Sequence, residues 1–145
     1  MTTEIPVVVD SSSARPIPSM NVEPILHEVH HALEKLLATG ESSMIDLRAM
    51  PLAPGEADEI QERLGAGEAV IHLDALGPST LTETRYPGVW WVEHRNSDDA
   101  VMGLYIEIAH VPSIVFPATE DIEDGLGDLA ENLNITDHSK GIDEL

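Results

Sequence analysis

From Glu68 to Ala109 the hydrophobic pattern changes to an approximate period of two, and this pattern restricts the fold more than any other feature of the chain. A period of two is typical of strands that bury one face. Turn-forming residues interrupt the pattern at Tyr86-Pro87-Gly88 and at Asn96-Ser97-Asp98-Asp99. The segment predicts strands at about Ala69–Leu73, Thr80–Tyr86, Val89–Arg95 and Val101–Ala109. Sequential strands with short connections form an antiparallel meander.

Upstream of this segment the hydrophobic period is helical. A first helix is predicted from about Val22 to Thr39, with Asn21 as N-cap and Gly40 just past its end. A short strand, Met44–Leu47, follows. The apolar stripe of the helix comprises Val22, Ile25, Leu26, Val29, Leu33, Leu36 and Leu37.

Two more helices are predicted, one on each side of the strand-rich segment. The first runs from about Gly55 to Leu64 and has an acidic first turn, which suits the helix dipole. The other spans about Ala118–Asn132, where Gly125 and Gly127 each cost about 1 kcal/mol relative to alanine. The fold class is therefore α+β: an antiparallel β-meander sheet with helices packed on one face.

The domain boundaries follow from composition. Residues 1–20 are rich in serine and proline and predict a disordered tail, with Val7–Val9 as one short candidate strand. Residues 21–133 form the α+β domain, and residues 134–145 form an acidic tail.

Strand alternation predicts which side chains face the helices. In the last strand Met102, Leu104, Ile106 and Ile108 are assigned to the core face. In the tryptophan-containing strand, Trp90 and Val92 are assigned to the same face. Trp91, Tyr105 and Tyr86 then lie on the side without helices. An aromatic sheet face of this kind is either a partner interface or a surface covered by the tails or the third helix.

Charge and composition exclude several classes of function. The formal net charge is −20, from 27 acidic against 7 Lys and Arg residues, which argues against partners that are nucleic acids or anionic membranes. The absence of cysteine excludes thiolate ligands and cysteine nucleophiles. No signal peptide and no apolar run long enough for a membrane span is visible, so a cytoplasmic location is expected.

The first predicted helix carries the best candidate metal ligands, since Glu23, His27, His30, His31 and Glu34 share one stripe. His27 and His31 are separated by four residues, a spacing at which two imidazoles reach one ion. Imidazole and carboxylate suit nickel or zinc. A solvated polar helix face with local His–Glu pairing explains the same residues. No metal or cofactor is therefore assigned.

Enzyme motifs are missing. Gly65-Ala66-Gly67 lacks the Lys-Ser/Thr ending of a phosphate loop. His72, Asp74, His94 and Ser79 offer triad-like residue types, but no strand-to-helix nucleophile elbow surrounds them. We expect a protein that is not an enzyme.

Several segments resemble one known family. They are Ile45-Asp46-Leu47-Arg48 with Pro51-Leu52, Leu76-Gly77-Pro78-Ser79, and above all the aromatic hairpin Tyr86-Pro87-Gly88-Val89-Trp90-Trp91-Val92-Glu93-His94-Arg95-Asn96. Together with Ile106-Glu107-Ile108, they are similar to the hydrogenase expression/formation proteins of HupH/HyaF type. The similarity runs from about Glu23 to Leu129.

The resemblance implies a maturation chaperone for nickel–iron uptake hydrogenase that binds the iron–sulfur small-subunit precursor or other maturation factors. Many family members carry two copies of the domain whereas this chain carries one, so a homodimer is hypothesised. A nickel-binding accessory module that uses His27 and His31 is the alternative. The candidate partner-binding residues are Glu83, Tyr86, Pro87, Gly88, Trp90, Trp91, Tyr105 and Glu107.

Overall fold

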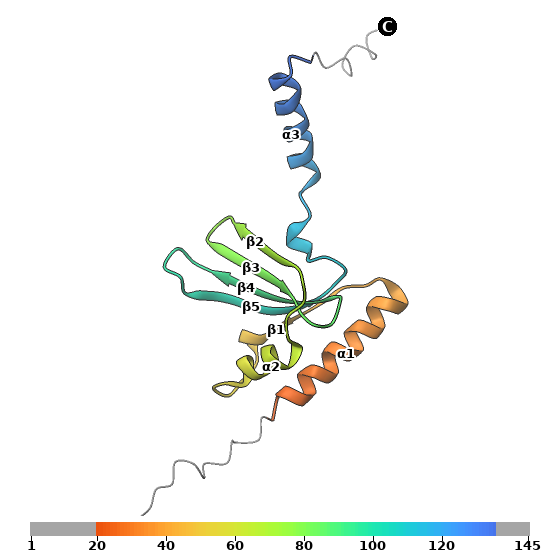
Figure 1. Cartoon of the computed structure of the whole chain (residues 1–145), viewed down its shortest axis with the longest axis vertical. Helices are drawn as coiled ribbons and strands as arrows, with labels where there is room; N and C mark the ends of the chain where they lie inside the picture. Colours follow the sequence, from red (N-terminus) through yellow and green to blue (C-terminus); the bar gives the residue numbers. More distant parts are fainter. Residues whose placement is uncertain (1–19, 136–145) are drawn as a thin grey trace, which may run out of the picture. The chain divides into compact units, whose positions relative to one another are not determined.

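The structure is a computed structural model and describes residues 20–135 (Figure 1). The candidate strand Val7–Val9 lies outside these residues. The chain divides into two compact units, and the boundary in sequence lies between His110 and Val111. The first unit contains α1 (Val22–Thr39), β1 (Ser43–Asp46), η1 (Leu47–Ala49), α2 (Glu56–Leu64), β2 (Val70–Asp74), β3 (Pro78–Glu83), β4 (Val89–Arg95) and β5 (Val101–Ile108). The second contains η2 (Ser113–Val115) and α3 (Thr119–Asn132).

The five strands form one antiparallel sheet in the order β1-β5-β4-β3-β2. The meander of the last four strands and the α+β class are confirmed. β1 completes the sheet by pairing with β5, with Ile45 opposite Ile106. Periodicity predicted β1 but not its neighbour, because the pairing joins segments about 60 residues apart in sequence and local patterns do not encode it.

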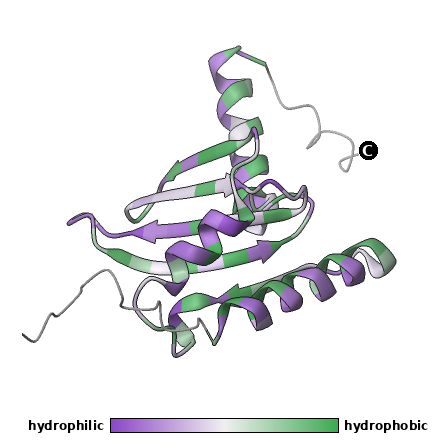
Figure 2. Ribbon diagram, turned by 60° about the horizontal axis from the view of Figure 1, so that its bottom comes forward, coloured by the Kyte–Doolittle hydropathy of each residue, from purple (hydrophilic) through white to green (hydrophobic). Residues whose placement is uncertain are grey.

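The main core lies between one face of the sheet and the helices α1 and α2. Figure 2 shows α1 with its hydrophobic side turned towards the sheet and its hydrophilic side turned away. For α3 the packing on this face stays a prediction. The core cluster joins Val22, Ile25, Val29, Ala32 and Leu36 of α1 with Ile60 and Leu64 of α2 and with Ile45, Leu47, Val89, Trp91, Ile106 and Ile108.

The face assignment of the two tryptophans was wrong. The register pairs Trp91 with Ile106, so Trp91 is the tryptophan that belongs to the helix-side core, where its exposed fraction is 5%. Trp90 pairs with Glu107 and faces the other way. After the Pro87-Gly88 turn, Val89 is the first residue of β4 on the core face. The predicted alternation was therefore one residue out, and such a shift exchanges every side chain of the strand between the two faces.

Three smaller assignments also differ. Met102 is 60% exposed, and a register shift between His94 and Arg95 lies opposite this end of β5. Leu37 is 85% exposed, and the buried stripe of α1 ends at Leu36. Tyr86 lies on the helix side of the sheet, where it lines the groove described below. Leu104, Ile106 and Ile108 pack on the helix side as predicted, and Tyr105 points to the opposite face.

The second unit is organised around α3. None of the residues of α3, all of which the structure describes, is buried. Its large apolar residues, Ile122, Leu126 and Leu129, are each more than half exposed. Among the residues described, no helix combines the length and the apolar character needed to cross a membrane.

Candidate functional site

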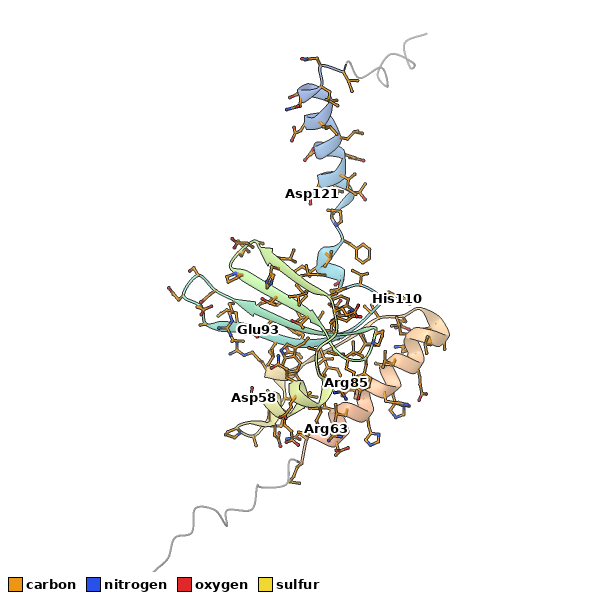
Figure 3. The ribbon with its side chains drawn as sticks, viewed as in Figure 1. Asp58, Arg63, Arg85, Glu93, His110 and Asp121 are labelled. Carbon is orange, nitrogen blue, oxygen red and sulfur yellow. The ribbon has the colours of Figure 1, made fainter. Side chains whose placement is uncertain are left out.

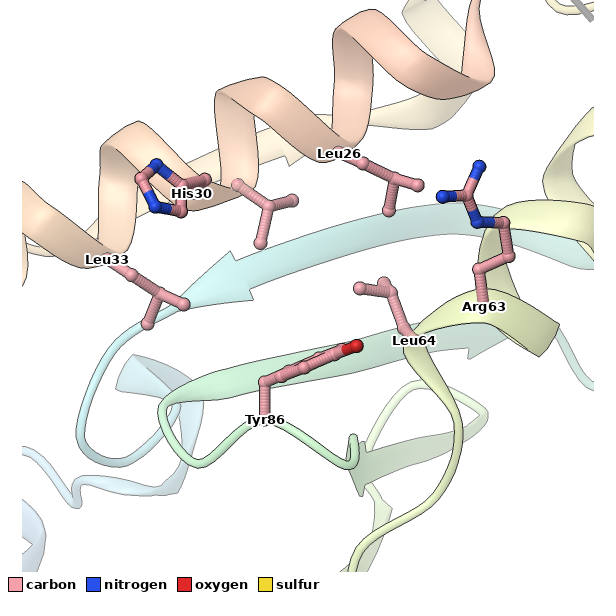
Figure 4. A pocket seen from close by; sticks show the side chains of 7 residues that line it. Leu26, His30, Leu33, Arg63, Leu64 and Tyr86 are labelled. Carbon is pink, nitrogen blue, oxygen red and sulfur yellow. The ribbon is translucent and has the colours of Figure 1, made fainter.

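A concave apolar groove opens between α1, α2 and the turn that joins β3 to β4 (Figure 4). Its volume is about 280 Å³. Cavities of this size accept one or two apolar side chains of a partner rather than a large cofactor. Leu26, Val29, His30 and Leu33 of α1, Arg63 and Leu64 of α2, and Tyr86 of the turn line it.

Local sequence explains how each wall forms. Leu26 and Leu33 lie on either side of the buried Val29 in sequence, at helical spacing, and are only partly buried, so they remain partly available after the core is filled. Gly88, with φ of +90°, lets the chain turn sharply after Tyr86. A Cβ at Gly88 would lie 3.4 Å from a Leu33 methyl group, so the turn sits directly against α1.

Two polar connections hold α1 and α2 together at the end of the groove. Arg63 of α2 donates a hydrogen bond to Glu23 in the first turn of α1, and Figure 3 shows Arg63 at this end of the helix pair. The bond lowers the pKa of the Glu23 carboxyl and raises that of the Arg63 guanidinium. Arg63 is thus a cation at the groove whose charge is already partly matched.

The second connection passes through Glu56, whose side chain is 5% exposed. Its carboxylate accepts hydrogen bonds from Nδ2 of Asn21 at 2.9 Å and from the backbone N–H of Ala53 at 3.0 Å. The bond from Asn21 lowers the pKa of the Glu56 carboxyl. Asn21 was expected to cap α1 with its side chain, but its amide instead ties the start of α1 to the start of α2.

The predicted partner-binding residues divide among three environments. Tyr86 is 44% exposed in the groove, and Pro87 and Gly88 carry it there. Trp91 is in the core. Glu83, Trp90, Tyr105 and Glu107 share the sheet face opposite α1 and α2.

On that opposite face, the register sets Glu83, Trp90 and Glu107 in one row across β3, β4 and β5. Trp90 is only 6% exposed, and its indole N–H donates to the Ala109 carbonyl at 3.2 Å. A carboxylate oxygen of Glu83 accepts from the Ala69 N–H at 3.3 Å. These contacts satisfy the Trp90 indole N–H and one carboxylate oxygen of Glu83 within the sheet.

The histidines of α1 do not group as their spacing in the sequence predicts. Ligand atoms of His30, His31 and Glu34 lie within 4.8 Å of one another, and all three residues are exposed. Nδ1 of His30 lies 2.9 Å from Oε1 of Glu34. The imidazole rings of His30 and His31 contact each other edge to face. His31 thus groups with His30 rather than with His27. His30 also lines the groove.

The triad-like residue types come together only in part. Oγ of Ser79 lies 2.7 Å from Nδ1 of His94. The His94 ring also contacts the Tyr105 ring in a tilted arrangement, with 5.7 Å between the ring centroids. His72 makes a separate contact with Thr80 at 3.5 Å. Ser79 lies within a strand, so it has no helix N-terminus behind it of the kind a nucleophile elbow supplies.

Sequence reasoning missed the groove itself. Leu26 and Leu33 belong to the apolar stripe of the first predicted helix, and Arg63 and Leu64 stand at the end of the second. Nothing in a periodic pattern says which edge of a stripe stays uncovered. The one available signal was Tyr86, an aromatic residue beside a Pro-Gly turn. Such a residue is exposed at a loop tip unless another element contacts it.

Comparison with known proteins identifies the family. Residues 19–136 match the family described as HupH hydrogenase expression protein, C-terminal conserved region. The chain is 31% identical over 117 residues to the hydrogenase expression/formation protein HoxQ of Azotobacter vinelandii, covering 77% of this chain and 40% of HoxQ. It is 32% identical over 94 residues to HupH of Rhodobacter capsulatus, covering 65% of this chain and 34% of that protein.

A solved structure agrees with these sequence matches. The hydrogenase expression protein HupH from Thiobacillus denitrificans ATCC 25259 superposes with a TM-score of 0.76 and 41% sequence identity, covering 80% of this chain and 97% of that one. By contrast, the chain spans only about 40% of the length of HoxQ. The aromatic hairpin and its flanking motifs therefore indicated the right relatives: the chain belongs to the HupH hydrogenase expression protein family and carries its C-terminal conserved region.

Proposed function

We propose that the chain acts in nickel–iron hydrogenase maturation as a non-catalytic cytoplasmic chaperone that binds the iron–sulfur small-subunit precursor. The names of its relatives, hydrogenase expression/formation proteins, support a maturation role. The observation that carries the binding role is the apolar groove, which presents Leu26, Leu33 and Tyr86 to solvent. A folding precursor exposes apolar segments, and a concave apolar site flanked by polar side chains suits such segments.

Tyr86 is the expected anchor of this interaction. It is half-exposed, it stands on a turn braced against α1, and tyrosine is among the residue types that dominate binding energy at interfaces. Its hydroxyl end lies towards Leu64 in Figure 4, so the ring forms one wall of the groove. Of the other predicted binding residues, Glu83 and Tyr105 are half-buried and stay a second proposed contact point. Trp90 and Glu107 are 6% and 4% exposed and offer little surface to a partner.

Tyr86→Ala is expected to weaken binding of the purified small-subunit precursor about tenfold, the equivalent of about 1.4 kcal/mol. Binding is measured by titration of the precursor against labelled protein. Met102→Ala is the matched control, because Met102 is a 60% exposed apolar residue of the same unit that does not line the groove. Equal affinity of Tyr86→Ala and the unaltered chain would remove the groove from the proposal. Failure of the unaltered chain to bind would remove the partner.

The ligand group on α1 supports a second candidate function, a nickel-binding accessory module. His30, His31 and Glu34 offer two imidazoles and a carboxylate within reach of one ion. If this function is correct, untagged protein takes up one equivalent of nickel in equilibrium dialysis and His31→Ala loses it. His72→Ala, which removes an exposed histidine of β2, is the control. Loss in His27→Ala with uptake retained in His30→Ala would assign the ion to the His27–His31 pair instead.

A further inference from the structure

The second unit exposes more large apolar side chains than a segment of its size requires. Of the side chains between Val111 and Ile135, eight large hydrophobic ones are at least 41% exposed. Single exposed apolar residues are ordinary, but a contiguous set marks an interaction surface. The eight are Val111, Ile114, Phe116, Ile122, Leu126, Leu129, Leu133 and Ile135.

On α3 and its C-cap these residues form a regular seam. Ile122, Leu126, Leu129 and Leu133 are spaced by four, three and four residues, which is the repeat by which two helices pack side by side. The spacing reads the same in both directions. An antiparallel copy would therefore set Ile122 against Leu133 and Leu126 against Leu129, in a self-complementary contact across a two-fold axis.

The charges of α3 fit such a pair. The helix carries six acidic residues and no Lys or Arg, so any close pairing of two copies must keep the acids away from the seam. At about 100° per residue, every acid except Glu123 lies more than about 100° from the centre of the seam. The positions that flank the seam are Glu123, Gly125, Ala130 and Asn132. Gly125 and Ala130 are small, which permits close approach of the two backbones.

The relative direction of the two α3 helices follows from the same charges. Four acids, Glu120, Asp121, Glu123 and Asp124, lie in the first half of α3. A parallel pair would place these two acidic halves side by side, whereas an antiparallel pair separates them and also opposes the helix dipoles favourably.

An isolated helix of this length and composition also needs support. Helices shorter than about 12–15 residues are marginal in water, and α3 has 14 residues, two of them glycine. A second copy of the chain can supply that support through the same seam residues. A basic partner is also a poor match for the seam, because the acids that would recognise it point away.

We propose that α3 is the dimerisation element of this protein, and that two copies pair through antiparallel packing of the Ile122, Leu126, Leu129 and Leu133 seam. The proposal is independent of the hydrogenase role, since it concerns only the association of the chain with itself.

The test is sedimentation equilibrium of the full chain over a range of concentrations. The unaltered chain is expected to be a dimer. The double change Leu126→Ala with Leu129→Ala is expected to raise the dissociation constant more than about a hundredfold, because each dimer loses four seam side chains. Alanine favours helix, so α3 itself is not broken. The matched control, Asp124→Ala with Asp128→Ala, changes the outer face and is expected to remain dimeric.

The antiparallel direction of the helices is tested by disulfide cross-linking. The chain contains no cysteine, so only the introduced cysteines can react. A mixture of Ile122→Cys and Leu133→Cys chains is expected to form a mixed disulfide dimer, while Ile122→Cys alone stays uncross-linked. Cross-linking of Ile122→Cys alone would overturn the antiparallel arrangement. A monomeric unaltered chain at all concentrations, or a dimer that survives the seam change, would overturn the interface.

Discussion

Replacing Trp91 by alanine is expected to lower the free energy of unfolding by about 3–5 kcal/mol, a large part of the roughly 5–15 kcal/mol of an ordinary domain. Trp91 is 5% exposed and belongs to the cluster in which α1 and α2 meet the sheet. Its removal leaves a cavity beneath both helices, which the surrounding side chains fill only in part. Urea-induced unfolding followed by circular dichroism measures the loss.

Tyr86→Ala is the control for this prediction, because Tyr86 is aromatic, lies only five residues earlier and is 44% exposed. It is expected to change the free energy of unfolding by much less than Trp91→Ala. The pair separates packing from binding: Trp91→Ala loses stability, and Tyr86→Ala loses affinity for the precursor. If Trp91→Ala kept full stability, the assignment of Trp91 to the helix-side core would be wrong.

Leu81→Ala is expected to cost about 2–5 kcal/mol, the second largest effect. Leu81 lies in the middle of β3 between Ile71 of β2 and Val92 of β4, on the face opposite α1 and α2, and its exposed fraction is 0%. The face that the sequence assigned to solvent or partner is therefore well buried at its centre. Thermal unfolding by calorimetry measures the effect.

Leu76→Ala is the matched control, since the same residue type stands five positions away with an exposed fraction of 101%. Its change in midpoint temperature is expected to stay within experimental error. A shift as small for Leu81→Ala as for Leu76→Ala would mean that the centre of this sheet face is accessible to water in solution, and would return it to the candidate interfaces.

The two sheet faces show why local patterns predict elements better than sites. The alternation in β4 is equally regular whether Trp90 or Trp91 faces the helices, because both residues are large and apolar. The pairing of Trp91 with Ile106 decides the matter, and that pairing depends on where the Pro87-Gly88 turn ends. A shift of one residue leaves the strand in place and exchanges its faces.

The candidate site was predictable only in fragments for the same reason. Tyr86 was named as a binding residue from its place beside a turn, and it does line the groove. Arg63, Leu26 and Leu64 were not predicted to be binding residues, since their proximity arises from the packing of α2 against α1. Likewise the spacing of His27 and His31 suggested one metal pair, whereas side-chain conformation groups His31 with His30 and Glu34.

By itself the sequence determined the helices, the meander, the α+β class and the family, because periodicity, turn chemistry and the aromatic hairpin are local properties of the chain. Only the tertiary structure decided the place of β1 beside β5, the burial of Trp91, the groove at Tyr86 and the unburied seam of α3. The first three depend on contacts between residues distant in sequence, and the seam is identified by the exposure of its side chains. Such contacts follow from strand register and helix packing, which a periodic sequence pattern does not specify.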